Sequence, residues 1–389
     1  MGVVVRKETM TSRERVVRTL NREKVDRVPI DLGSHMSTGI SAFTYWNLRE
    51  KLGFPVEKVD MPDVVQCLAR VETDVLERFH CDAVVVEPAW QHPEIWNPRG
   101  KYKFVVPAEM KPTLNKDGEW IVESGEASMR LPKNGFFFDG SWLSGWGIGS
   151  IDEQIALYAK EAERLFKETS YALHFVGYSF GMQFGAYFKG IDHAIQMIDD
   201  PDEALRMCER VSDQNIMMFD KINKAMGRYL NLISIGDDMG TQRGPLCRPD
   251  FIEEFSMPFY KKFCDHVHNT SDIKVFMHNC GSIKSLIPMI IEAGIDVLNP
   301  VQISADNMIP EELKREFGKD IIFWGGGCDT QHVLDSSSPE QVAEHVRGLV
   351  RTFKSDGGFV FNQVHNITGL VPPENVIAMF DAAYEESFY

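Results

Sequence analysis

Short runs of apolar residues alternate along the chain with longer segments in which apolar residues recur every three to four positions. The short runs are typical of buried strands, and the longer segments are typical of amphipathic helices. At least one helical segment follows each short run, for example residues 43–52 and 62–79 after the first run, so strand and helix alternate over most of the sequence. The predicted strands lie at residues 27–32, 83–87, 172–176, 232–235, 275–278, 296–299, 321–324 and 359–362.

Strands that alternate with helices indicate parallel pairing through right-handed crossovers. Eight such units are the number that closes an α/β fold into a (β/α)8 TIM barrel. A doubly wound open sheet is the alternative, but no Gly-x-Gly-x-x-Gly follows the first predicted strand and the sequence contains no phosphate-binding loop. We therefore predict a single TIM-barrel domain over residues 1–389.

The alternation breaks between residues 89 and 150. This segment holds a predicted hairpin near residues 120–130 and many aromatic side chains, among them Trp142 and Trp146. A structureless loop of that length is uncommon in a compact domain, so we predict a β-rich insertion, or cap, after strand two. The aromatic side chains either pack the insertion onto the barrel or form one wall of a substrate pocket.

Composition narrows the classes of partner. The chain is 43% hydrophobic and can bury a large core, while 57 acidic against 41 basic residues give a net charge of −16. This charge argues against nucleic acid and against anionic membranes, and favours a small molecule or another protein as partner. Seven scattered cysteines, an odd number, favour reduced thiols. With no secretory segment and no run near ~18 apolar residues, we expect a soluble cytoplasmic protein.

In a TIM barrel the active site forms at the C-terminal ends of the strands, and almost every predicted strand here ends in polar residues. Asp237 and Asp238 are candidates for proton transfer, and the alternative is that one of these carboxylates binds loop amides. His365 is a third catalytic candidate, either as a substrate contact or as a group that orients one. The candidate substrate contacts are Glu87, Trp142, Trp146, Tyr178, Asn299, Gln302 and Asn366.

Three residues at strand ends could hold a metal ion. His278 and Cys280 follow one strand, and side chains two residues apart on an extended chain point the same way. Cys328 follows a second strand after a glycine cluster. Cys328 alone is typical of a packed core and His278 alone of a hydrogen-bonded polar residue, but together the three form a His, Cys and Cys set that suits zinc, with a fourth position open. We therefore predict that His278, Cys280 and Cys328 bind zinc, and His365 is the alternative as a nitrogen ligand.

Several separated segments resemble the uroporphyrinogen decarboxylase superfamily, in the right order along nearly the whole chain. They are Met10–Val16, Asp26–Pro29, Gly236–Gly240, His278–Ser282, Gly294–Gln302 and Val371–Asn375. The resemblance implies a TIM barrel, in agreement with the strand pattern. It also implies one of two chemistries, because the superfamily contains decarboxylases of porphyrinogens and corrinoid-linked methyltransferases.

The motifs favour the second chemistry. The decarboxylases carry an arginine-rich segment for porphyrinogen carboxylates, whereas residues 31–37 contain no arginine. The methyltransferases resemble this chain in holding zinc with His-x-Cys and a distant Cys. Members that methylate coenzyme M place that Cys near the last strand, where this chain has residues 363–366 and no cysteine. The downstream cysteine is Cys328, one strand earlier.

The resemblance thus implies a zinc-dependent methyltransferase that moves a methyl group between a small substrate and the cobalt of a separate corrinoid protein. A methyl ether, and hence O-demethylation, is slightly favoured over coenzyme M or another thiol. Two further hypotheses stay open. One is a metal-free decarboxylase that uses Asp237 or Asp238, and the other is a noncatalytic binding protein on the same barrel.

Overall fold

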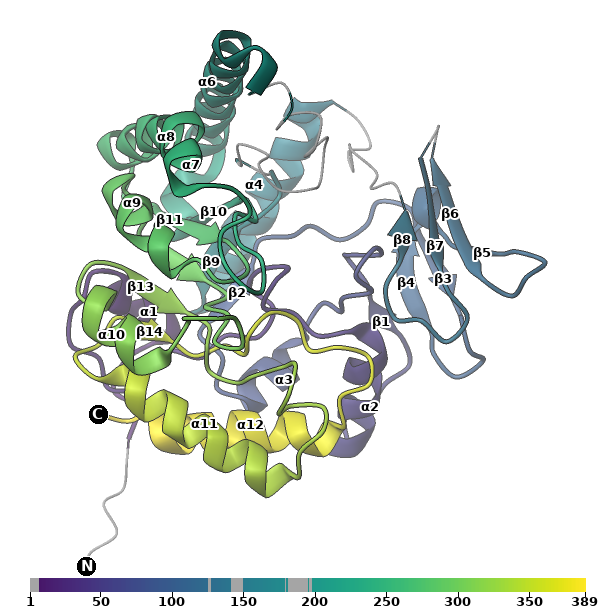
Figure 1. The fold of residues 1–389 in the computed structure, drawn as a ribbon. Coiled ribbons are helices and arrows are strands. Elements are labelled where there is room, and N and C mark those ends of the chain that lie inside the picture. The colour runs from purple at the N-terminus through teal and green to yellow at the C-terminus, as the bar shows by residue number, and fades with distance from the viewer. Residues whose placement is uncertain (1–6, 125–126, 141–149, 179, 181–194, 196–197) are drawn as a thin grey trace, which may run out of the picture.

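The computed structural model describes every residue except 1–6, 125–126, 141–149, 179, 181–194 and 196–197. Its centre is a curled sheet of seven parallel strands in the order β14-β13-β12-β11-β10-β9-β2 (Figure 1). The order follows the sequence, as expected when each strand is joined to the next by a right-handed crossover. The strands are β2 (Ala83–Val85), β9 (Ala172–Phe175), β10 (Leu232–Gly236), β11 (Lys274–His278), β12 (Val297–Asn299), β13 (Ile322–Trp324) and β14 (Phe359–Val360).

The first predicted strand, residues 27–32, closes the sheet into a barrel. On one side Phe361 N donates to Pro29 O at 2.8 Å, and on the other Asp82 N donates to Ile30 O at 2.7 Å. The segment forms a bridge rather than a regular strand, because Pro29 has no N–H and Ile30 N donates to the Asp82 carboxylate. The predicted TIM-barrel fold is confirmed.

Helices cover the outside of the barrel, and several begin with an N-cap side chain. Thr11 caps the first helix, and Ser150 and Ser338 form capping boxes. The helix predicted over residues 62–79 is confirmed only over its last part, as α3. The helices are α1 (Ser12–Leu20), α2 (Ala42–Leu52), α3 (Thr73–Arg78), α4 (Ile151–Glu168), α6 (Pro201–Met226), α7 (Pro249–Phe255), α8 (Met257–Thr270), α9 (Ile287–Glu292), α10 (Pro310–Phe317), α11 (Pro339–Lys354) and α12 (Pro373–Ser387).

The segment after β2 is the predicted β-rich insertion, and it projects from one side of the barrel (Figure 1). Its rings pack onto the barrel: Phe136 meets Phe43 of α2 edge to face, and Phe138 N donates to Val65 O. That it covers the barrel mouth stays a prediction. Its strands are β3 (Pro93–Trp96), β4 (Phe104–Pro107), β5 (Thr113–Leu114), β6 (Trp120–Ser124), β7 (Ala127–Leu131) and β8 (Asp139–Gly140), with β1 (Val59–Asp60) beside β4.

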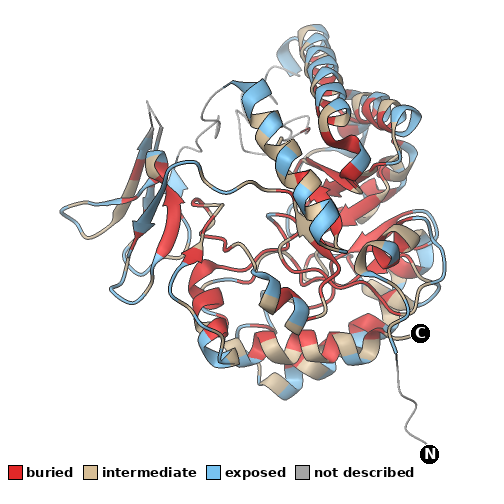
Figure 2. Ribbon diagram, turned by 180° about the vertical axis from the view of Figure 1, so that it is seen from behind, coloured by how far each residue is buried: buried red, intermediate tan, exposed pale blue. Residues whose placement is uncertain are grey.

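Two apolar clusters form the core. A small cluster, which includes Phe276 and Trp324, fills the barrel, and a larger one lies between strands and helices. Figure 2 shows the strands of the barrel sheet as mostly buried, and the outer helix faces as largely exposed. No helix in the described part of the chain is long and apolar enough to span a membrane.

Candidate functional site

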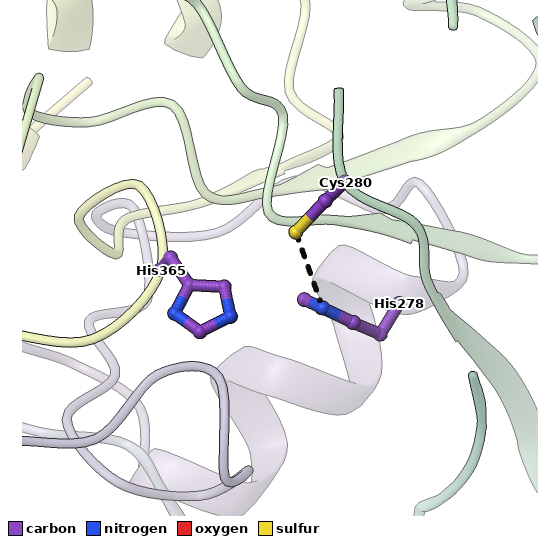
Figure 3. A group of neighbouring side chains, drawn as sticks. All are labelled: His278, Cys280 and His365. Atoms are coloured by element: carbon purple, nitrogen blue, oxygen red, sulfur yellow. Dashed lines mark hydrogen bonds between the residues drawn. The ribbon is translucent and has the colours of Figure 1, made fainter. Parts of the chain in front are cut away.

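His278 and Cys280 lie side by side where β11 ends. His278 Nε2 and Cys280 Sγ are 3.4 Å apart, as the two-residue spacing predicts (Figure 3). The chain turns directly afterwards at Gly281, which has a φ of +94°. A Cβ there would lie 2.5 Å from the carbonyl carbon of Gly240, so this close approach of two loops requires glycine.

Asn299 lies behind His278 and selects the tautomer of its neutral ring. β11 and β12 pair in a register that places His278 opposite Asn299. Asn299 Nδ2 donates to Trp324 O at 2.9 Å, which turns Asn299 Oδ1 toward His278 Nδ1, 2.8 Å away. An amide oxygen only accepts, so Nδ1 carries the proton and Nε2 offers a lone pair beside Cys280.

His365 approaches the same place from the loop after β14. Its φ is +60°, and Gln363 Nε2 donates to its carbonyl oxygen at 2.9 Å. This uncommon backbone conformation, held by a side chain, turns the ring toward His278, with ring centroids 5.3 Å apart. Burial, followed by the neighbouring His278, lowers the pKa of His365 to about 4, so the ring is neutral near pH 7.

Ligand atoms of His278, Cys280 and His365 all lie within 4.8 Å of one another. Figure 3 shows one ring nitrogen of His365 directed toward the other two side chains. Two imidazole nitrogens and one sulfur form a donor set that suits zinc, and three protein ligands leave a fourth position open. The residues present therefore fit a catalytic metal.

Cys328, the third ligand predicted from the sequence, is not part of this group. It is fully buried, belongs to the cluster between strands and helices, and its thiol lies 3.8 Å from Asp329 O. Burial raises the pKa of this thiol, as expected of a packed cysteine. The structure thus brings His365, rather than Cys328, to His278 and Cys280.

The two predicted catalytic aspartates differ in position. Asp237 is buried and accepts a hydrogen bond from Tyr260 of α8. Asp238 borders the ligand group: its Oδ1 accepts from Cys280 N at 2.9 Å and lies 3.7 Å from His278 Nε2. Burial, followed by the charge of Asp238, raises the pKa of the Cys280 thiol. Asp238 is therefore the carboxylate closest to any chemistry at this site.

Three predicted substrate contacts form hydrogen bonds within the protein itself. Asn299 is fully buried behind His278. Gln302 accepts from Gly281 N at 2.8 Å, and Asn366 accepts from Gly39 N at 2.9 Å. The structure thus gives these amides a supporting position, and their contact with substrate stays a prediction.

The other predicted substrate contacts lie farther from the ligand group or outside the described residues. Glu87 is partly buried, with Oε2 3.5 Å from Arg70 Nη1, and burial raises the pKa of its carboxyl. Tyr178 is partly buried against Phe180. Trp142 and Trp146 belong to the part of the chain that is not described.

Two residues behind the site, His35 and Ser37, were given no role by the sequence analysis. The His35 ring stacks on His278 and on His174, with centroids 5.8 Å and 5.4 Å away. Burial lowers the pKa of both His35 and His174, so uncharged rings meet. Ser37 Oγ donates to Asn299 Oδ1 at 2.6 Å. In the sequence, only the position of His35 and Ser37 just after the first predicted strand indicated that they could lie near the site.

Comparisons with known proteins point to one family. The family model "Uroporphyrinogen decarboxylase (URO-D)" matches residues 185–386. Uroporphyrinogen decarboxylases of Dichelobacter nodosus and Vesicomyosocius okutanii are 27% and 25% identical over 35% and 42% of this chain. These matches span 36% and 47% of the two relatives' own lengths. A methyltransferase structure from Methanosarcina mazei has a TM-score of 0.58 at 15% identity, over 97% of this chain and 99% of that one, which shows a shared fold.

Proposed function

The chain belongs to the uroporphyrinogen decarboxylase (URO-D) family, and from this premise we propose that it is a metal-dependent methyltransferase. In this proposal it moves a methyl group between a small substrate and the cobalt of a separate corrinoid protein. The observation that carries the proposal is the convergence of His278, Cys280 and His365 within 4.8 Å at the ends of β11 and β14. The shared fold with a methyltransferase supports it.

Zinc is the metal that suits these nitrogen and sulfur donors. A neutral His278 ring would present Nε2 to the metal without a change of tautomer, because Asn299 Oδ1 accepts from Nδ1. His365 Nδ1 accepts the N–H of Asn366 at 2.8 Å, so a metal held by Nε2 would require the ring proton on Nδ1 and the loss of this hydrogen bond. Metal binding would thus change the tautomer of His365 but not that of a neutral His278 ring.

When bound, zinc supplies a Lewis acid for a substrate thiol or ether oxygen. The chain's own groups prepare the site. Cys280 binds as a thiolate, so its proton must leave, and Asp238 is the carboxylate that contacts it. Burial keeps His365 uncharged, so the ring adds no positive charge beside the metal.

A methyl ether remains the favoured substrate over a thiol such as coenzyme M. Trp142 and Trp146 of the insertion, which lie outside the described residues, would suit an aryl or similarly apolar group. The argument from Cys328 no longer contributes, because that thiol is packed away from the ligand group.

Decarboxylation of a cyclic acid is the alternative, and the names of the curated relatives favour it. Against it, residues 31–37 contain no arginine, and all of them except Gly33 and Met36 are buried. Asp31 in this segment is fully buried and accepts hydrogen bonds from Trp324 Nε1 and Ser34 Oγ, each at 2.8 Å. This segment therefore offers no clamp for an acidic porphyrinogen.

The test combines metal analysis with a transfer assay. Purified protein is analysed for zinc, then mixed with a panel of methyl aryl ethers and methyl thioethers and with a Co(I) corrinoid protein, whose methylation is followed by absorbance. We expect about one zinc per chain and zinc-dependent transfer. Cys280→Ala should lose both. Cys247→Ala is the matched control, because Cys247 is a half-buried thiol outside the ligand group. Full transfer after removal of all metal would overturn the proposal.

A further inference from the structure

Asn299 is the residue on which the geometry of His278 depends. We propose that Asn299 is a positioning residue that fixes the proton on His278 Nδ1 and the direction of the ring, and so sets the affinity of the metal site. The proposal rests on the metal site of the proposed function and adds to it a residue that touches neither metal nor substrate.

The orientation of the Asn299 amide follows from its surroundings. Its NH2 group faces Trp324 O at 2.9 Å, a carbonyl that can only accept. Its oxygen must therefore face the opposite side, where His278 Nδ1 lies at 2.8 Å and Ser37 Oγ at 2.6 Å. Asn299 is fully buried, so water does not compete for these bonds.

The hydrogen bonds of Asn299 together fix the orientation and the tautomer of the His278 ring. The bond to Trp324 O holds the amide against rotation, and β12 carries the amide beside β11 in the sheet. The bond from His278 Nδ1 then fixes both the ring angle and the tautomer. Without it, the ring can turn or carry its proton on Nε2, where the metal would bind.

Partners of this kind generally change metal affinity by about 10- to 100-fold when they are lost. We therefore expect Asn299→Ala to weaken zinc binding by about 10- to 100-fold. Asn299→Asp keeps an oxygen toward His278 and should restore most of the affinity, although it loses the donor to Trp324 O. Ser37→Ala leaves the bond between His278 and Asn299 in place, so its effect should be the smallest of the three.

Asn375 provides a matched control for the loss of a buried amide. It is almost fully buried, and its Nδ2 donates to Leu334 O at 2.8 Å and to Ser337 O at 2.9 Å. It lies at the start of α12 and makes no contact with the ligand group. Asn375→Ala should lower stability and leave zinc affinity unchanged, which separates a general loss of stability from a loss of positioning.

The experiment measures zinc dissociation constants of the full-length protein by competition with a chromophoric chelator. Nitrogen-15 NMR of the metal-free wild-type protein reports the tautomer directly, whether or not a variant folds. We expect the His278 proton on Nδ1. A proton on Nε2, or an Asn299→Ala variant that is folded and binds zinc as tightly as wild type, would overturn this inference alone. If wild-type protein binds no zinc at His278 and Cys280, the proposed function fails as well.

Discussion

Asp82 holds the first barrel segment in place, and replacing it with asparagine should destabilise the whole barrel. Its carboxylate accepts from Arg15 Nη1 and Arg27 Nη1, both at 2.6 Å, from Arg27 Nη2 at 3.1 Å and from Ile30 N at 2.9 Å. Asp82 is fully buried, and the two arginine side chains are nearly so. The Asp82→Asn substitution keeps the shape of the side chain and removes its charge, which leaves two guanidinium groups with less compensation.

The magnitude follows from this burial. Removing one partner from a buried ion pair typically costs about 3–5 kcal/mol. Arg15 keeps Asp26, and both arginines keep the half-exposed Glu8, so we take the lower end, about 3 kcal/mol. At about 2 °C per kcal/mol for a large domain, the thermal midpoint falls by roughly 6 °C.

Urea denaturation followed by circular dichroism measures this loss. Asp381→Asn is the control, because Asp381 makes a similar two-bond pair with Arg78, but both side chains are more than a third exposed. That control should lose less than about 1 kcal/mol. If Asp82→Asn costs no more than Asp381→Asn, the buried network does not close the barrel and the reasoning is wrong.

Three further predictions concern acid stability, the turn and the substrate. His174 is fully buried, and burial lowers its pKa to about 3, below the value near 6.5 of an unfolded histidine. The unfolded state therefore binds the proton first, so the free energy of unfolding should fall below pH 6.5 by about 1.4 kcal/mol per pH unit. His174→Gln should reduce this pH dependence, which urea titrations at pH 7 and pH 5 measure. Gly281→Ala would place a Cβ 2.5 Å from Gly240 on a residue with a φ of +94°. We expect the free energy of unfolding to fall by about 2–4 kcal/mol and bound zinc to be lost. A variant with wild-type stability and zinc content would refute the close approach. Uroporphyrinogen should not be decarboxylated, and turnover on the order of 1 per second would place the chain with the decarboxylases.

The alternation of strands and helices sufficed to predict the barrel, because each strand is buried and each helix has one apolar face. It overstated two elements. Residues 27–32 form bridges instead of a strand, because Pro29 has no N–H to donate and the N–H of Ile30 donates to the Asp82 carboxylate instead of a neighbouring strand. Of the helix predicted over residues 62–79, only α3 exists, and an Asp63 side chain that caps Gln66 N holds a turn before it.

Within the site, the sequence spacing correctly predicted the contact between two residues of one strand end. His278 and Cys280 share one strand end, so their proximity follows from the two-residue period. The choice between Cys328 and His365 depends on loops instead. Cys328 follows three glycines, whose backbone direction the sequence does not reveal, and His365 turns inward through a φ of +60° held by Gln363. Asn299 was expected at the mouth, but the sheet register places it behind His278.

The zinc content of two matched variants tests the central claim most directly. His365→Ala and Cys328→Ala are purified alongside wild-type protein, exchanged into metal-free buffer that contains a weak chelator, and analysed for zinc per chain. Because His365 lies within 4.8 Å of the other two ligand atoms and Cys328 is packed in the core, wild type and Cys328→Ala should hold about one zinc, and His365→Ala should lose most of it. A Cys328→Ala variant without zinc, beside a His365→Ala variant with its full complement, would contradict the site described for this barrel.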